Sequence, residues 1–202
     1  MKSSERIARG LYLLTPDEAD TSRLLARVDA ALAGGPTWLQ YRNKAANAAL
    51  RREQAAALLP LCRARGVPLI VNDDWALAAD LGASDGELRR ARAVLGATAI
   101  LGASCYDDPA RARAAADEGA SYIAFGAFFP SPTKPGARAA PLSLLREHAG
   151  GPLPVVAIGG ITPDNAPAVV AAGADLVAAI TGVFDAADPA AAVRAYGRAF
   201  AP

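Results

Sequence analysis

The chain has 202 residues, 52% of them hydrophobic, and its 21 Lys and Arg against 20 Asp and Glu leave a formal net charge of +1. This length suits a single domain, residues 1–202, that buries a large core without disulfides or a structural metal. A charge so close to neutral argues against nucleic acid or an acidic membrane surface as a partner, because both require a broad excess of basic side chains.

The cysteine and histidine content and the N-terminal sequence further limit which class of protein this can be. Cys62 and Cys105 lie in apolar contexts without Cys-x-x-Cys spacing, and His148 is the one histidine, so we expect packing or surface roles rather than a zinc site. The N-terminus has no apolar signal-peptide core, and no run of 18 apolar residues lacks charge or proline. We therefore expect a reduced, cytoplasmic protein without a membrane span.

Short apolar runs alternate along the chain with longer runs rich in Ala, Leu and Arg, which is typical of a parallel sheet with helical connections. The predicted strands are residues 11–15, 38–42, 68–73, 99–105, 122–128, 154–160 and 176–181. The predicted helices are residues 22–32, 48–65, 75–81, 87–95, 109–118, 142–148, 164–172 and 189–200. Seven strands and eight helices predict an α/β fold, a (β/α)8 TIM barrel with one strand too few.

Strand four is the one predicted to be missing or truncated. Residues 82–86, Gly-Ala-Ser-Asp-Gly, are all that separate the third predicted helix from the fourth. These residue types have low β propensity, and five residues cannot supply two turns and a crossing strand. If the chain is continuous there, consecutive Cα atoms through Ala83, Ser84 and Asp85 should be about 3.8 Å apart.

Polar residues follow six of the predicted strands, at the end where (β/α)8 enzymes build their active sites. These stretches are Gln40-Tyr41-Arg42-Asn43-Lys44, Asn72-Asp73-Asp74, Ser104, Ser131-Pro132-Thr133-Lys134, Gly159-Gly160 and Thr181-Gly182. Because the C-terminal ends of parallel strands lie together, we expect Arg42, Asp73, Lys134 and Gly160 to border one pocket.

Gln40, Arg42 and Lys44 are spaced so that their side chains share one face if the strand continues. Arginine and lysine both suit phosphate oxygens, so two cations at this place indicate an oligophosphate site. A solvated strand end is the alternative interpretation of the same pattern.

Asn72 and Asp73 offer the oxygen ligands that Mg²⁺ takes beside substrate phosphates. Asp73 or Asp74 could equally cap the helix that follows, and the pattern does not separate these two roles. Asp85, next to Gly86, is typical of a helix N-cap when judged on its local sequence alone.

Three further stretches suit an anion. Ser131, Thr133 and Lys134 supply hydroxyls and a cation to a proline-bounded loop. Gly159-Gly160 precedes a helix and resembles turns in which glycines let backbone N–H groups approach a phosphate. Ile180-Thr181-Gly182 would complete the same phosphate site, because the phosphate site of (β/α)8 enzymes usually follows the last two strands.

Together these stretches resemble the thiamine phosphate synthase family over nearly the whole chain. The shared segments are residues 10–16 (GLYLLTP), 38–44 (WLQYRNK), 68–73 (PLIVND), 102–104 (GAS), 125–134 (FGAFFPSPTK), 157–161 (AIGGI) and 179–184 (AITGVF). The resemblance implies a (β/α)8 barrel that couples a hydroxymethylpyrimidine diphosphate with a thiazole phosphate and releases pyrophosphate, with Mg²⁺ as cofactor. Small phosphorylated molecules are the implied partners, and a homo-oligomer is left open.

The family's functional residues carry over by position. The implied contacts to the pyrimidine diphosphate are Gln40, Arg42, Lys44, Asn72, Ser104 and Lys134, with Tyr41 and Asn43 in the same binding stretch. The implied contacts to the thiazole phosphate are Ser131, Pro132, Thr133, Gly159, Gly160, Ile180 and Thr181. Asp73 and Asp85 would hold Mg²⁺. The catalytic role, stabilising the departing pyrophosphate, would belong to Arg42, Lys44 and Lys134.

The chain departs from the family pattern at strand four. There the family has a short strand, reading roughly Gly-Val-His-Leu-Gly, before the acidic pair that contains its second magnesium ligand. Here that strand is missing. If it is deleted, Asp85 would lack the element that positions it, and Mg²⁺ affinity should fall; if residues are instead omitted between Ala83 and Asp85, Asp85 could face Asp73 across Mg²⁺. Ser131 and Thr181 stand where the family commonly has Thr and Ser, and both keep a hydroxyl.

Two rival functions remain. A thiazole tautomerase-like isomerase would use the same barrel but would need no diphosphate site, so the presence of Arg42, Lys44, Asp73 and Lys134 argues against it. A noncatalytic relative that binds thiazole phosphate or thiamine phosphate could result from the loss of strand four. The absence of a histidine base does not weigh against the synthase, because the coupling requires no protein nucleophile.

Overall fold

A computed structural model of the chain describes residues 8–74, 77, 88–130 and 139–201. Within them, the strands are β1 (Gly10–Leu14), β2 (Trp38–Tyr41), β3 (Leu69–Val71), β4 (Gly102–Tyr106), β5 (Tyr122–Gly126), β6 (Val155–Ile158) and β7 (Leu176–Ala179). They form one parallel sheet in the order β3-β2-β1-β7-β6-β5-β4. The first and last strands are therefore neighbours, as in an α/β barrel, and each falls within a predicted strand apart from the ends of β1 and β4.

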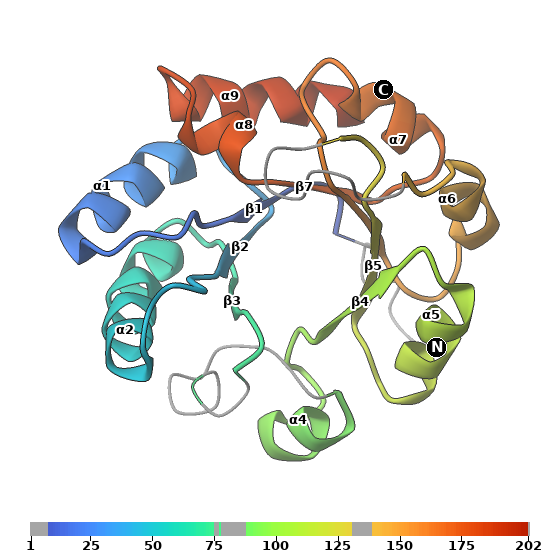
Figure 1. Ribbon diagram of the computed structural model, residues 1–202, viewed down its shortest axis with the longest axis horizontal. Coiled ribbons are helices and arrows are strands. Elements are labelled where there is room, and N and C mark those ends of the chain that lie inside the picture. Colours follow the sequence, from blue (N-terminus) through green and yellow to red (C-terminus); the bar gives the residue numbers. More distant parts are fainter. Residues whose placement is uncertain (1–7, 75–76, 78–87, 131–138, 202) are drawn as a thin grey trace.

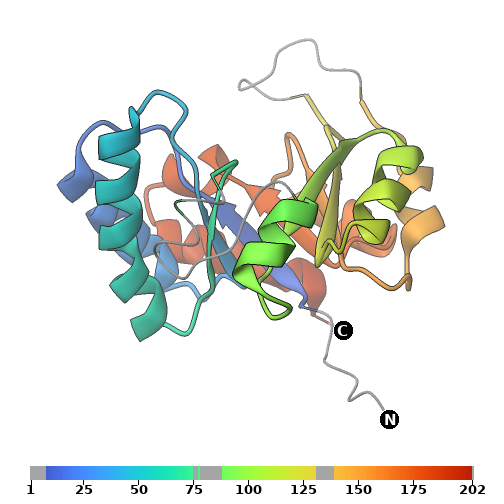
Figure 2. The ribbon, with the colours of Figure 1, turned by 90° about the horizontal axis from the view of Figure 1, so that it is seen from below.

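The helices surround this curled sheet (Figure 1). They are α1 (Thr21–Leu32), α2 (Ala48–Ala64), α4 (Leu88–Leu95), α5 (Pro109–Asp117), α6 (Ser143–His148), α7 (Ala166–Ala171), α8 (Thr181–Phe184) and α9 (Pro189–Gly197), with a 3-10 turn η1 (Arg198–Phe200) at the end. Figure 2 shows α2 on one flank of the strands and α5 on the other. The result is a TIM-barrel-like α/β fold, as predicted.

The predicted break lies between β3 and β4, which are the two edges of the sheet in the described part of the chain. Ala83, Ser84 and Asp85 lie outside the described residues, and so does the predicted helix 75–81 apart from Leu77. The seven strands match the predicted number. The missing strand itself stays a prediction.

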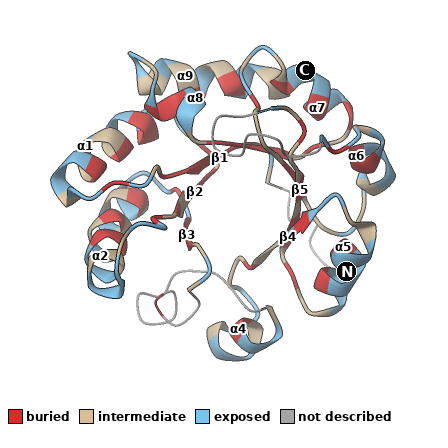
Figure 3. Cartoon of the chain, in the orientation of Figure 1, coloured by how far each residue is buried: buried red, intermediate tan, exposed pale blue. Residues whose placement is uncertain are grey.

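Alternation along the strands produces two apolar layers. One set of side chains, including Leu13, Leu39 and Phe125, is buried between the sheet and the helices, whose buried faces turn inward (Figure 3). The alternate set, including Tyr12 and Trp38, fills the inside of the barrel. Burying one such side chain contributes about 1.5–3 kcal/mol. A one-residue slip of a strand would exchange the two sets, so the register is strongly specified.

Acidic and amide side chains define where the helices begin. Asp20, Asn47, Asp108 and Asp188 each accept a hydrogen bond from a first-turn backbone N–H of α1, α2, α5 and α9. Such a cap is worth about 1 kcal/mol. The short helix α8 was not predicted, because Thr181 was expected to end a strand and instead begins this helical turn.

Cys62, Cys105 and His148 have the packing roles expected of them. Both cysteines are buried free thiols, and burial raises the pKa of each to about 11. His148 places its Nδ1 2.9 Å from the carbonyl oxygen of Leu144, and its ring packs against Phe125. Across the described residues, no helix is both long enough and apolar enough to span a bilayer.

Candidate active site

A cavity of about 290 Å³ opens where β2 and β3 end. It is lined by Tyr41, Asn43, Lys44, Arg51, Val71, Asn72, Asp73 and Asp74. Five of these residues were predicted site residues, and they come from two different strand ends. The cavity therefore combines cationic side chains with carboxylates, which is the mixture that a phosphate–metal site requires.

The loop between β1 and α1 anchors the basic segment after β2. Because β2 ends at Tyr41, Arg42 and Lys44 lie in a loop, and the continued strand that would place them on one face is not formed. Thr15 Oγ1 accepts from the backbone N–H of Arg42 and donates to the Arg42 carbonyl oxygen, both at 2.8 Å. Asp17 Oδ1 accepts from Arg42 Nη1 at 3.2 Å and from the backbone N–H of Lys44 at 2.8 Å. A single carboxylate thus fixes both basic residues.

Gln54 is a fully buried polar side chain beneath this loop. Its Oε1 accepts from the Tyr41 hydroxyl at 2.8 Å and from Asn43 Nδ2 at 3.0 Å, and its Nε2 donates to the Glu18 carbonyl oxygen at 2.9 Å. Asn43 Nδ2 also donates to that carbonyl, at 2.6 Å. Burial raises the pKa of Tyr41 to about 12, so its hydroxyl remains a donor. In this structure the Tyr41 and Asn43 side chains hold the loop that carries Lys44.

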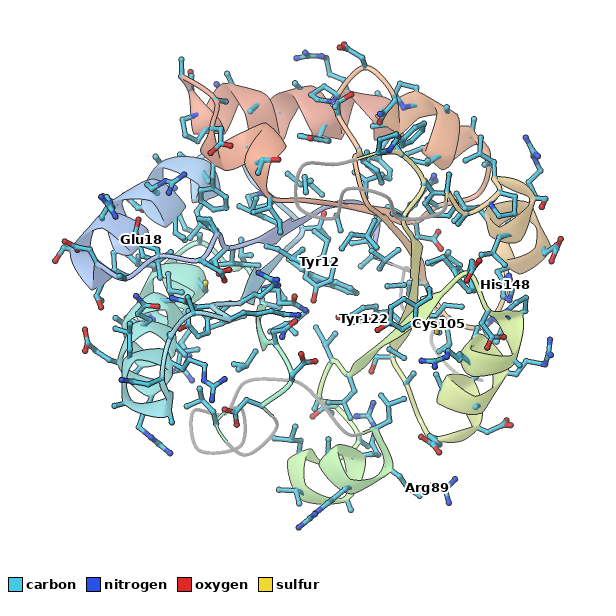
Figure 4. The ribbon with its side chains drawn as sticks, viewed as in Figure 1. Tyr12, Glu18, Arg89, Cys105, Tyr122 and His148 are labelled. Atoms are coloured by element: carbon cyan, nitrogen blue, oxygen red, sulfur yellow. The ribbon has the colours of Figure 1, made fainter. Side chains whose placement is uncertain are left out.

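The Glu18 carboxylate, buried beside α1 (Figure 4), closes the same loop onto that helix. Arg23 donates to it twice, from Nε to Oε2 and from Nη2 to Oε1, each at 2.6 Å. The Asp20 backbone N–H donates to Oε1 at 3.1 Å. The hydrogen bonds from Arg23, followed by that from Asp20, lower the pKa of Glu18 from 4.5 to about 2. The carboxylate is therefore ionised at neutral pH.

Gln40 faces the inside of the barrel, where aromatic residues orient it. Its Nε2 donates to the Tyr12 hydroxyl at 2.8 Å, and the Tyr12 and Tyr122 hydroxyl oxygens lie 2.7 Å apart. Both tyrosine side chains point toward the centre of the barrel (Figure 4). Trp38 packs edge-on against Tyr12, with ring centroids 5.4 Å apart. These rings form a floor that fixes the amide of Gln40.

Of the two roles predicted for the Asn72-Asp73-Asp74 stretch, the structure shows the helix cap. Asp74 Oδ1 accepts from the Leu77 backbone N–H at 2.9 Å, as a helix cap does. Asp73 has φ +54°, and its Oδ2 accepts from Asn72 Nδ2 at 2.8 Å, so both side chains remain at the cavity. In the described ranges no three His, Cys, Asp or Glu side chains cluster as metal ligands. Asp73 is thus the cavity carboxylate that does not cap the helix, and its role as a Mg²⁺ ligand stays a prediction.

The glycine turn after β6 is specified by close packing. Gly160 has φ +63°, and a Cβ there would collide with the carbonyl oxygens of Phe129 and Pro130. Asn165 Nδ2 donates to the Gly160 carbonyl oxygen at 3.0 Å and so holds the turn at the start of α7. Glycine is therefore required for the fold of this turn.

The turn after β7 leads directly into α8. Val183 donates the first hydrogen bond of that helix to the Ile180 carbonyl oxygen, at 3.1 Å, so the N–H groups of Thr181 and Gly182 precede the helical ladder. Buried Tyr196 donates to the Ile161 carbonyl oxygen at 2.8 Å and packs against Gly182. One tyrosine thus joins the two turns that were predicted to hold a phosphate.

The remaining predicted site residues lie apart from the cavity or outside the described residues. Ser104 is exposed in β4 and pairs with Ala124 of β5. Ser131, Pro132, Thr133, Lys134 and Asp85 lie outside the described residues. Arg42, Asp73 and Gly160 all follow C-terminal strand ends, as expected, and of these three Asp73 lines the cavity. Their convergence on one pocket with Lys134 stays a prediction.

The residues of this site that sequence reasoning missed include Thr15, Arg51 and Gln54. Gln54 had a detectable signal, because it occupies the buried stripe of α2 together with Ala55 and Leu58. A polar residue on an apolar helix face indicates a specific partner. Thr15 and Arg51 have no such signal in their local sequence.

The chain forms a curled parallel sheet within a ring of helices. Polar residues lie at the strand ends, and turns that contain glycine follow the last two strands. These features define an α/β barrel that binds phosphorylated ligands. The profile of the family described as thiamine monophosphate synthase matches residues 11–183. The chain belongs to this family.

Known relatives agree with that assignment. A thiamine-phosphate synthase of Xanthomonas campestris pv. campestris (strain 8004) is 58% identical over 200 residues, 96% of each chain. A thiamine-phosphate synthase of Azoarcus sp. (strain BH72) is 57% identical over 205 residues, 98% of this chain and 99% of the other. The solved structure of thiamine phosphate pyrophosphorylase from Pyrococcus furiosus is similar, with a TM-score of 0.81, 30% identity and 94% of each chain covered.

The activity is accordingly that of the family: synthesis of thiamine phosphate by transfer of a pyrimidinylmethyl group, with release of pyrophosphate. The tautomerase-like and noncatalytic alternatives are not favoured, because both relatives carry the synthase name at more than 50% identity. A solved 3-hexulose-6-phosphate synthase, at 18% identity and a TM-score of 0.69, is similar in fold alone.

Proposed function

We propose that the cavity at the ends of β2 and β3 binds the diphosphate of hydroxymethylpyrimidine diphosphate during this transfer. The observation that carries the proposal is the meeting of Lys44 and Asp73 in one cavity. A lysine can neutralise phosphate oxygens, and a carboxylate across the same space suits a divalent cation shared with the phosphates. The rest of the substrate would extend toward Gln40 inside the barrel.

The donor set fits Mg²⁺. Asp73 and Asn72 supply hard oxygen ligands at the cavity, and Asp85 would be the second carboxylate. When bound, Mg²⁺ would withdraw charge from the diphosphate oxygens and so improve the leaving group.

The chemistry needs no protein nucleophile. As the C–O bond to the diphosphate breaks, its electron pair leaves with pyrophosphate, and the aminopyrimidine delocalises the positive charge on the carbon. The thiazole nitrogen then forms the new C–N bond. Arg42, Lys44 and Lys134 would stabilise the departing pyrophosphate, while Gln40 orients the pyrimidine from the aromatic floor.

The thiazole phosphate would bind on the far side of the barrel mouth. Backbone N–H groups in the Gly159-Gly160 turn and at Thr181 suit an anion, and Tyr196 holds the two turns together. Ser131 and Thr133 would add hydroxyl donors. This arrangement aims the thiazole nitrogen at the pyrimidine carbon.

Two broader expectations remain proposals. Cytoplasmic location is supported by the two buried, unpaired thiols, which suit a reducing compartment. A homo-oligomer is left open by both sequence and fold.

The test measures pyrophosphate release with both substrates and Mg²⁺, beside calorimetry with each ligand alone. We expect turnover that requires both substrates and falls about 100-fold in Lys44→Ala, because one charge that stabilises the leaving group is lost. Arg63→Ala, at the exposed C-terminal end of the same α2, is the control and should retain full activity. Ligand binding without turnover in the unmodified chain would contradict the proposal.

A further inference from the structure

Arg51 lies in the first turn of α2 and lines the cavity from the side of that helix. Its Nε is fully buried and has no hydrogen-bond partner among the described residues. An unpaired buried N–H loses its hydrogen bond to water without gaining another, so native proteins retain few of them. A guanidinium that lines a cavity and has an N–H without a protein acceptor is suited to a ligand that brings acceptor oxygens.

Arg42, another basic residue at this edge, differs from Arg51 in its contacts. The Arg42 guanidinium is held by Asp17, with Nη1 3.2 Å from Oδ1. Within the described part of the chain, Arg51 has no carboxylate within 4.0 Å. The cavity carboxylates have partners of their own, since Asp73 accepts from Asn72 and Asp74 from the backbone of Leu77. Among the described residues, the guanidinium of Arg51 is thus a cation without a counterion at a concave site.

We propose that Arg51 binds the diphosphate of the pyrimidine substrate and the pyrophosphate product, as a further ligand beside Lys44. The inference rests on the function proposed above. A guanidinium offers a planar pair of donors to two phosphate oxygens, whereas a lysine supplies a single compact charge. Because Arg51 stands on a helix rather than in the loop after β2, its position does not depend on how that loop closes.

Arg51 should affect the binding of only one of the two substrates. Arg51 lines the cavity at β2 and β3, whereas the glycine turns proposed for the thiazole phosphate follow β6 and β7. Loss of Arg51 should therefore weaken binding of diphosphates and leave the affinity for the thiazole monophosphate unchanged.

The experiment is calorimetry of the full chain with inorganic pyrophosphate and Mg²⁺, together with KM values for both substrates. A charge-assisted hydrogen bond is worth about 1.5–3 kcal/mol, so Arg51→Gln should raise the pyrophosphate Kd about 10- to 100-fold. Arg51→Lys keeps the charge but loses the planar pair of donors, so its pyrophosphate Kd should lie between those of the unmodified chain and Arg51→Gln. If Arg51→Gln is unstable, Arg51→Lys replaces it in the test. Arg52→Gln removes the same charge from the exposed neighbouring position and should bind like the unmodified chain.

The outcomes are distinguishable. An unchanged pyrophosphate Kd in Arg51→Gln, with or without a lower melting temperature, would show a structural role and overturn this inference alone. Equal losses in Arg51→Gln and Arg52→Gln would indicate a general charge effect and also overturn it. If the unmodified chain neither binds nor releases pyrophosphate, the proposed function and this inference both fail.

Discussion

Replacing Gln54 with leucine should both destabilise the protein and loosen the loop that carries Lys44. The change keeps a side chain of similar length in a fully buried position but removes three hydrogen bonds. The Glu18 carbonyl oxygen keeps its bond from Asn43 Nδ2 at 2.6 Å, whereas the buried Tyr41 hydroxyl loses its acceptor. An orphaned buried hydroxyl costs about 1–3 kcal/mol and a lost bond about 1 kcal/mol, so the free energy of unfolding should fall by about 2–4 kcal/mol.

A double-mutant cycle with Tyr41→Phe tests this reasoning. Removing the hydroxyl as well as its acceptor should restore about 1–2 kcal/mol to Gln54→Leu, because no unsatisfied donor is then left. Urea denaturation gives the unfolding free energies, and an unchanged m value would show that the two states compared are the same. Steady-state kinetics of Gln54→Leu should show a raised KM for the pyrimidine diphosphate and an unaltered KM for thiazole phosphate. Strictly additive stability effects, or an unaltered KM for both substrates, would refute the network as the support of this loop.

Three further predictions concern charge. The pKa of Glu18 is lowered from 4.5 to about 2, so its contribution to stability is complete above about pH 4.5 and is lost as the pH falls toward 2. In Glu18→Gln, the melting temperature should therefore fall less steeply as the pH is lowered through this range. An unchanged acid dependence of the melting temperature would contradict the assignment. Lys134→Ala should lower turnover by about two orders of magnitude with little change in melting temperature, and the reverse pattern would give that residue a structural role. In a magnesium titration of activity, Asp73→Asn should shift activation to higher concentration, and an Asp85→Asn curve that matches the unmodified chain would remove Asp85 from the metal site.

Much of the fold was predictable because its signal is local. The apolar runs that became β1 to β7 are short and separated by helical segments, and the inner and outer layers follow because side chains alternate along any strand. The glycine turn at Gly159-Gly160 was recognisable because few residues other than glycine adopt its backbone angles. Helix α8 was missed because four residues are too few to show a helical period.

The support of the site was not predictable, because it depends on residues far apart in sequence. Thr15 holds the backbone of Arg42 across 27 positions, and Gln54 reaches the carbonyl of Glu18 across 36. No local pattern specifies which of many polar residues will meet. The local sequence likewise did not show that Asp74, rather than Asp73, caps the helix, because Asp73 has a left-handed backbone that neighbouring residue types do not predict.

The pairing of β1 with β7 has a consequence for how the chain could be rearranged. The spatial order of the strands is a rotation of their order in sequence, because reading across the sheet from β4 gives 4, 5, 6, 7, 1, 2, 3. A circular permutant that joined the present ends and opened the chain between β3 and β4 would therefore place every strand next to its neighbour in sequence. Its contacts would be shorter in range, and chains with a lower contact order fold faster. The residues of the cavity at β2 and β3 would stay on one continuous stretch of such a chain, and so would the turns after β6 and β7.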